Sequence, residues 1–287
     1  EIARRLGRLA ADDDEAFAVT PDGAVLWRGA QAGQIVGGDW FAPRVRLLGE
    51  MGPAAARERA QRRLEAWLAS EAGRALRALR RLKAAVETGQ LKGLPRGLAF
   101  RLVEAGGIID RREVEHDLAA LSQAERRTLK SFGVRLGAHS VWLPALLKGR
   151  APAVAQAFVA DEAFRPAPGV AALPDPAPSA RMLAAYGLRA VGRLAAGVEL
   201  LEAMAERRAR NKGALTETDL AELGLSPEQA KALASGLKTT RAQQPARPRK
   251  SAAPPKDSPF AALSALASPA AAPPARRKRA RPRRKPA

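Results

Sequence analysis

The 287-residue sequence contains no cysteine, only two histidines and no long apolar run. Without cysteine the chain has neither disulfides nor thiolate metal ligands. Because it has only two histidines, His116 and His139, we expect no zinc site. No apolar run approaches the ~20 residues that span a bilayer. The first residues lack the basic lead and apolar core of a signal peptide. We therefore expect a soluble cytoplasmic protein without a membrane partner.

The sequence also lacks the motifs of a self-contained enzyme. Glycine is never followed by lysine, so the phosphate-binding Gly-x-x-x-x-Gly-Lys loop is missing, and we expect no nucleotide hydrolysis by this chain alone. Asp14–Phe17 and Asp161–Phe164 mimic a helicase Asp-Glu-x-x box, but the first follows an acidic run and the second ends a predicted helix. We interpret both as coincidental. Two histidines provide no credible Ser/His/acid set, so no catalytic residue, no metal site and no cofactor is predicted for this chain.

Positive charge is what the chain has in excess. Its 49 Lys and Arg against 29 Asp and Glu give a net charge of +20, which favours a polyanionic partner, nucleic acid first and an anionic membrane second. Residues 241–287 hold 13 Lys or Arg and one acid, a net charge of +12, which leaves +8 for residues 1–240. This tail of Ala, Pro, Lys and Arg cannot bury enough surface to offset ordering entropy, so we predict that it is disordered.

Short strands are predicted near the N-terminus. Residues 17–20 and 24–27 flank Pro21-Asp22-Gly23, a strong turn signal. Residues 34–36 and 44–48 add two further short strands, so a small antiparallel sheet is expected. The preceding acidic run, residues 12–15, could attract a cation, although such a run is more typical of a solvated loop.

Helices are predicted over most of the remaining sequence. Apolar residues recur at helical spacing from Pro53 to about Thr88, with Gly73 as the expected point of division. Further helices are expected over 95–105, after Asp110 with Glu113 as its capping partner, from the Ser122–Glu125 capping box to near Gly133, and over 152–163, 179–210, 217–223 and 227–236.

Together these elements predict a mainly α protein with a small N-terminal antiparallel β element, an α+β fold, followed by a disordered basic C-terminal tail. The expected organisation is a β-rich segment over 1–50, a helical domain over 51–164, a Pro-rich linker over 165–178, a small helical domain over 179–240 and the tail over 241–287.

The helical stretch from Pro53 to Thr88 carries cations along its polar face, opposed by few acids. They are Arg57, Arg59, Arg62, Arg63, Arg74, Arg77, Arg80, Arg81 and Lys83. Such a face is either a solvated helix surface or a rail for nucleic-acid phosphates. Arg77, Arg80 and Arg81 are the candidate contacts that we take from it.

The segment Gly133–Lys148 combines two glycines, a proline and several cations with an apolar run. One interpretation is a wall of an RNA path, in which Arg135, Lys148 and Arg150 contact phosphates and His139 stacks or hydrogen bonds. The other is a packed scaffold, in which Gly133 ends a helix, Trp142 and Leu143 are core, and Lys148 is solvated. The sequence does not separate the two.

The C-terminal third offers weaker signals. Arg276, Arg277, Lys278 and Arg279 open a dense basic block that should bind nucleic acid loosely, with strong salt dependence. The apolar island Asp257–Leu263 is either a docking peptide centred on Phe260 or carries no function. The pattern of residues 220–237 is similar to a helix-turn-helix motif. The polar residues of its second helix are more typical of a small helical packing unit than of a helix that contacts DNA bases.

Several segments, in this order along the chain, resemble one family. They are Ala24–Gly29, Leu94–Glu104 with its Arg-Gly-Leu-Ala-Phe run, Gly133–Lys148 as the best match, and Gly187–Arg189. Taken together they resemble the C-terminal region, after the motor, of Suv-type superfamily 2 helicases, the bacterial relatives of the mitochondrial RNA-degradosome helicase. The similarity covers about residues 5–240. The Ser258–Leu263 run in the basic tail is also similar to these proteins.

The resemblance implies an ATP-dependent helicase whose two RecA-like domains precede residue 1, with ATP and magnesium bound there. The chain begins with Glu and carries no ATP-handling motif, so no catalytic residue transfers to it. What the resemblance implies is a mostly helical platform that guides single-stranded RNA or DNA beside the motor. The alternatives are a free-standing architectural or regulatory nucleic-acid binder with a histone-like tail, and an adaptor that docks a nuclease through Phe260.

Overall fold

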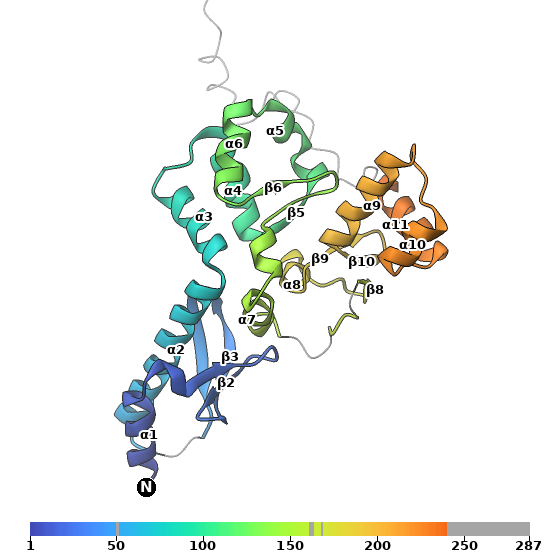
Figure 1. Ribbon diagram of the computed structural model, residues 1–287. Coiled ribbons are helices and arrows are strands. Elements are labelled where there is room, and N and C mark those ends of the chain that lie inside the picture. The colour runs from blue at the N-terminus through green and yellow to red at the C-terminus, as the bar shows by residue number, and fades with distance from the viewer. Residues whose placement is uncertain (50–51, 161–163, 168, 240–287) are drawn as a thin grey trace, which may run out of the picture. The chain divides into compact units, whose positions relative to one another are not determined.

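The computed structural model describes residues 1–49, 52–160, 164–167 and 169–239. These residues belong to one compact unit, and they are mainly helical with small antiparallel sheets (Figure 1). The predicted α+β fold class is therefore confirmed. The tail over 241–287, including Phe260 and the basic block, lies outside the described residues, as does most of Asp161–Phe164.

A four-stranded antiparallel sheet forms near the N-terminus, with the order β1-β2-β3-β4. Its strands are β1 (Phe17–Val19), β2 (Ala24–Trp27), β3 (Ala30–Asp39) and β4 (Ala42–Leu47). This confirms the predicted hairpin and both added strands. The sheet packs on α2 (Ala54–Ala75), which also contacts α1 (Ile2–Ala11), a helix that was not predicted from the sequence.

The long helical stretch is divided at Leu76, not at Gly73 as predicted. Leu76 leaves helical geometry, with φ −97° and ψ 32°, between α2 and α3 (Arg77–Glu87). The Leu76 side chain is fully buried in the apolar core, so the residue between the two helices also contributes to packing. Gly73 stays inside α2, where a Cβ atom would lie 2.8 Å from Nη1 of Arg80. The glycine provides room for that guanidinium instead of ending the helix.

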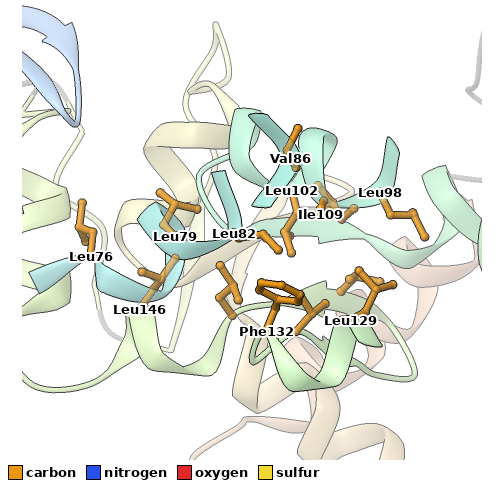
Figure 2. Packing of buried hydrophobic residues seen from close by; sticks show 14 of the residues in the cluster. Leu76, Leu79, Leu82, Val86, Leu98, Leu102, Ile109, Leu129, Phe132 and Leu146 are labelled. Carbon is orange, nitrogen blue, oxygen red and sulfur yellow. The ribbon is translucent and has the colours of Figure 1, made fainter. Parts of the chain in front are cut away.

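The largest apolar cluster lies among α3 and the elements that follow it. Leu79 and Leu82 of α3 meet Leu102 and Leu129 of later helices and Phe132, which follows α6 (Figure 2). These elements are α4 (Gly93–Glu104), β5 (Ile108–Asp110), η2 (Arg111–Val114), α5 (Glu115–Ala120) and α6 (Gln123–Ser131). Trp40, at the turn between β3 and β4, inserts into the same cluster and so ties the sheet to the helices.

Helix starts were predicted well where a capping box is present. Ser122 and Glu125 exchange hydrogen bonds at the start of α6, as predicted. After Asp110 the prediction was wrong in detail. The Asp110 carboxylate accepts from the backbone N–H of Arg112, whereas Glu113 forms an ion pair with Arg101 instead of capping.

The segment Gly133–Lys148 forms a short hairpin and a turn. Its elements are β6 (Arg135–Leu136), β7 (Ser140–Trp142) and η3 (Pro144–Leu147), and β5 pairs with β7 to complete a sheet of order β5-β7-β6. The following helix, α7 (Ala151–Ala157), ends before the predicted boundary at residue 163.

The predicted single helix over 179–210 is wrong. The chain forms α8 (Ala180–Ala185), a hairpin of β9 (Leu188–Val191) and β10 (Leu194–Gly197), and only then α9 (Val198–Arg210). Gly187 and Gly192 have φ of +69° and +62°, which a continuous helix does not allow. The apolar residues that fit helical spacing are divided between two helices and two strands.

Part of the predicted linker over 165–178 is also sheet, because β8 (Val170–Ala172) pairs with β10. The last described elements are α10 (Glu217–Leu223) and α11 (Pro227–Thr239), which start as predicted. Helix α11 packs on β9 and β10, which agrees with a packing unit. No helix in the described ranges has the length and apolarity needed to cross a membrane.

Candidate nucleic-acid interface

The centre of Gly133–Lys148 is buried. Trp142 is 2% exposed and Leu143 is fully buried, while Gly133 lies two residues after the end of α6 and has φ +86°. The Arg135 guanidinium lies over the Trp142 ring, 5.7 Å from its centroid. These features match the scaffold interpretation, with cations left at the two ends of the segment.

At one end of the segment, Glu202 of α9 holds the turn between β6 and β7. Its carboxylate accepts hydrogen bonds from the backbone N–H groups of Ala138, His139 and Ser140, at 2.6, 2.9 and 2.8 Å. A Cβ atom on Gly137 would overlap both this carboxylate and the ring of Trp142. A glycine is therefore needed at position 137, because the neighbouring side chains leave no room for a Cβ atom. The amides of the turn already bind an anion, the Glu202 carboxylate.

Buried charges lie beside this turn. Arg189, 6% exposed, forms an ion pair with Asp110, and Arg112 binds the same carboxylate at 2.7 Å. Burial alone would raise the pKa of Asp110, but the Arg112 hydrogen bonds and the Arg189 charge lower it. Asp110 thus remains ionised, whereas burial lowers the pKa of Arg189, a shift that the charge of Asp110 opposes. The pair joins β5 to β9.

Sequence reasoning did not find this pair or Glu202. The sequence offered one signal for Arg189, because this arginine stands among the apolar residues of 188–191. In the structure Leu188, Arg189 and Val191 are buried. Glu202 gave no signal of its own, because it lies 62 to 64 residues from the amides that it binds.

His139 is half-buried near the same charges. Burial is the main cause that lowers its pKa, and Arg189 and Arg112 lower it further, while Glu202 opposes them. The ring is therefore neutral near pH 7. This suits the predicted role in stacking or hydrogen bonding and does not suit phosphate neutralisation.

The other end of the segment lies against the junction of α2 and α3. Glu71, whose side chain is 5% exposed, forms ion pairs with Arg74 at 3.1 Å and with Arg150 at 2.8 Å. The Arg80 guanidinium reaches back to Gly73 in the last turn of α2. One buried carboxylate thus positions two arginines, and a third approaches the same turn.

Two more cations flank this place. Arg77 is exposed at the first residue of α3, and Lys148 is exposed directly after η3, which packs on α3. We call Arg74, Arg77, Arg80, Lys148 and Arg150 the junction cluster. Since Arg150 is 72% and Arg74 55% exposed despite their ion pairs, these guanidinium groups remain accessible to a phosphate.

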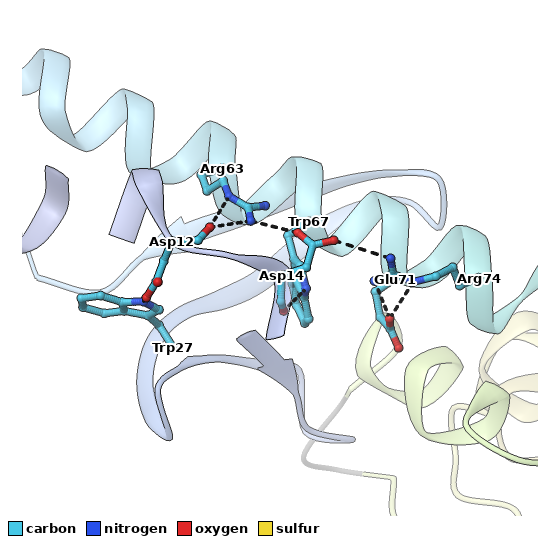
Figure 3. A network of polar contacts seen from close by, with 7 residues as sticks. All are labelled: Asp12, Asp14, Trp27, Arg63, Trp67, Glu71 and Arg74. Carbon is cyan, nitrogen blue, oxygen red and sulfur yellow. Dashed lines mark hydrogen bonds and ion pairs between the residues drawn. The ribbon is translucent and has the colours of Figure 1, made fainter. Parts of the chain in front are cut away.

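The remaining cations of the long helical face divide into two kinds. Arg63 is committed to structure, because it binds the backbone oxygen of Asp12 and the carboxylate of Asp14 (Figure 3). Arg81 lies over the Phe132 ring at 4.9 Å and keeps an exposed side chain. The face is thus partly scaffold and only partly a surface for phosphates.

The same network corrects the expectation of a solvated acidic loop over residues 12–15 for two of its four residues, whereas Asp13 and Glu15 are exposed as expected. Asp12 accepts from the Trp27 indole at 2.6 Å and from Arg28, and its pKa is strongly lowered, first by Arg28 and then by Trp27. Asp14 pairs with Arg63 and with Arg74. Asp12 thus binds the end of β2 through its carboxylate, Asp14 binds α2, and the segment between them links the helix to the sheet (Figure 3).

The structure therefore separates the predicted contacts. It brings Lys148 and Arg150 to the α2–α3 junction with Arg77 and Arg80, whereas Arg135 and His139 lie toward α9. Arg276, Arg277, Lys278 and Arg279 lie outside the described residues.

Comparisons with protein-family models, with curated proteins and with solved structures gave no match to this chain.

Proposed function

We propose that this chain is an accessory nucleic-acid-binding region that guides a single strand of RNA or DNA beside an ATP-dependent helicase motor. Several segments resemble Suv-type helicases and follow one another in the same order along the chain, and this resemblance is our reason for proposing a helicase motor beside it. The observation that carries the binding role is the junction cluster, in which one buried carboxylate pairs with Arg74 and Arg150, and the other three cations lie on the adjoining elements.

The cluster suits the backbone of a nucleic acid more than its bases. Guanidinium groups bind phosphate oxygens in a planar, often bidentate geometry. Glu71 reduces the freedom of Arg74 and Arg150, so less ordering entropy is lost when a phosphate binds. Binding of this kind releases counterions and weakens steeply as salt increases.

The test is a triple substitution, Arg77→Ala, Arg80→Ala and Lys148→Ala, in the full chain. We expect weaker binding of a fluorescent single-stranded RNA, and the slope of log affinity against log salt should fall by about 2, at roughly 0.7 per phosphate contact. Fluorescence anisotropy between 50 and 200 mM salt measures both quantities. Arg74 and Arg150 are left intact because their loss would strand Glu71 as a buried charge.

The matched control removes three exposed arginines of α1, through Arg4→Ala, Arg5→Ala and Arg8→Ala. Its net charge equals that of the junction variant, so a general electrostatic effect would weaken both equally. Equal losses in the two variants would contradict a role for the junction cluster. The chain alone should show no RNA-stimulated ATP hydrolysis, and turnover above a blank would contradict the accessory role.

A further inference from the structure

A second polar surface lies at the opposite end of α7 from the junction cluster. It is a groove of about 600 Å³, lined by β3, β4, the turn between β1 and β2, the end of α7 and Tyr186. Gly23 allows this closeness, because a Cβ atom there would lie 2.8 Å from the backbone oxygen of Ala157. The volume is within the range of small-molecule sites.

Three glutamines converge on this groove, which we call the glutamine groove: Gln31, Gln34 and Gln156. The Gln34 amide is fixed at both ends, since it donates to the backbone oxygen of Asp22 and accepts from Gln31, each at 3.0 Å. Within the described ranges, no hydrogen bond occupies the Gln31 amide oxygen or the Gln156 side-chain amide. The groove therefore presents unused donors and acceptors in a partly fixed arrangement.

The charges in the groove favour an anionic ligand. Arg46 and Arg165 are exposed and have no ion pair among the described residues, while Asp22 is the one carboxylate of the lining. The pKa of Asp22 is lowered, first by the nearby Thr20 side chain and also by the charge of Arg165, so this carboxylate stays ionised and offsets part of the charge of Arg165. Two cations against one acid leave a positive balance.

Apolar contact comes from Tyr186 and Leu48. The Tyr186 ring is held edge-on against Phe164, with the centroids 5.9 Å apart, and its hydroxyl donates to the Phe164 backbone oxygen at 3.4 Å. Leu48 is 43% exposed. Amides for base edges, guanidinium groups for phosphate and an aromatic ring are the contacts that single-stranded nucleotide recognition uses.

We propose that the glutamine groove holds one nucleotide of the bound strand, with Gln31 and Gln156 hydrogen bonded to the base edge and Arg46 or Arg165 on a phosphate. This rests on the proposed function and adds base preference to it. Gln156 lies six residues from Arg150 along α7, about 9 Å of helix rise. The groove is therefore within reach of a strand whose backbone lies on the junction cluster.

The first measurement titrates the full chain with each of the four ribonucleoside 5′-monophosphates and follows the side-chain amide signals of Gln31 and Gln156 by NMR. Saturable shifts with at least one nucleotide, absent in Arg46→Ala plus Arg165→Ala, are expected. No shift with any nucleotide overturns the glutamine groove, whatever the result for the junction cluster.

The second measurement compares single-stranded oligonucleotides of one base each. We expect the tightest and weakest to differ by about 5-fold or more. Gln31→Ala plus Gln156→Ala should bring this ratio toward one while the salt slope stays unchanged, and Gln123→Ala, an exposed glutamine on α6, should keep the ratio. The junction triple variant should weaken every oligonucleotide and keep the ratio. If the ratio between the tightest and the weakest affinity is unchanged in Gln31→Ala plus Gln156→Ala, the inference is overturned. If the wild-type chain binds none of the oligonucleotides, the proposed function is overturned.

Discussion

His139 shows how the surroundings of one residue determine its charge. Its side chain is half-buried next to two arginines, and the backbone of the same residue binds Glu202. Burial lowers the pKa because the charged ring loses solvation that no partner fully replaces. The consequence is a fold that prefers the neutral imidazole.

This preference predicts a pH dependence of stability. Histidine titrates near 6.5 in the unfolded chain, and the folded pKa is lower. The unfolded state therefore binds a proton first as the pH falls, so stability is fully present above 6.5 and is lost as the pH decreases toward the folded pKa. Urea denaturation at pH 7.5 and at pH 5.5 measures the loss.

His139→Gln should reduce that loss, because the glutamine does not titrate. His116→Gln is the matched control, since the His116 side chain is 91% exposed. A wild-type pH dependence in His139→Gln would show that the imidazole is not its source.

At the scale of elements, Glu202 connects α9 to the β6–β7 turn. Three consecutive amides bind its carboxylate, and Arg189 with Asp110 adds an ion pair between neighbouring strands. Hydrogen bonds to a charged group are among the stronger ones. The turn within Gly133–Lys148 is thus held by a helix more than 60 residues further along the chain.

Glu202→Ala should lower the free energy of unfolding by about 1–3 kcal/mol, because backbone donors lose a charged acceptor. Glu206→Ala, one turn further along α9 and 73% exposed in its pair with Arg210, should change it by less than about 1 kcal/mol. Urea titrations of both variants test this. Equal effects would mean that the amides of the turn find other partners.

Elements with local signals could be predicted, and elements without them could not. The box at Ser122 depends on residues three apart, so the start of α6 followed from the sequence. Thr216 was predicted only as the cap of 217–223, and the structure adds its exchange of hydrogen bonds with Asp219. Over residues 179–210 the apolar spacing suggested a helix, because the short strands β9 and β10 are too brief to display their own alternation. Strand pairing there outweighed helical periodicity.

At the scale of the whole molecule, charge is the dominant property. The chain carries +20, of which residues 241–287 contribute +12. Cations in a tail add affinity for any polyanion without requiring a defined site. The junction cluster adds cations at fixed positions, so the two should contribute different parts of the binding.

Deleting residues 241–287 should weaken RNA binding and flatten its salt slope, while the base preference of the remaining chain is kept. Anisotropy titrations across salt concentrations measure both. A full-length chain with Arg276, Arg277, Lys278 and Arg279 changed to Gln separates charge from length. An unchanged slope after the deletion would mean that the tail does not contact the strand.

The sequence by itself determined the fold class, the N-terminal sheet, the capped helix starts and the excess of positive charge, because these follow from composition and from patterns among near neighbours. Only the tertiary structure decided which cations gather and which are committed to the scaffold. Arg150 meets Glu71, and Glu202 meets Ala138, across 79 and 64 residues of chain. Such contacts depend on how whole elements pack, and no local pattern of residues records that packing.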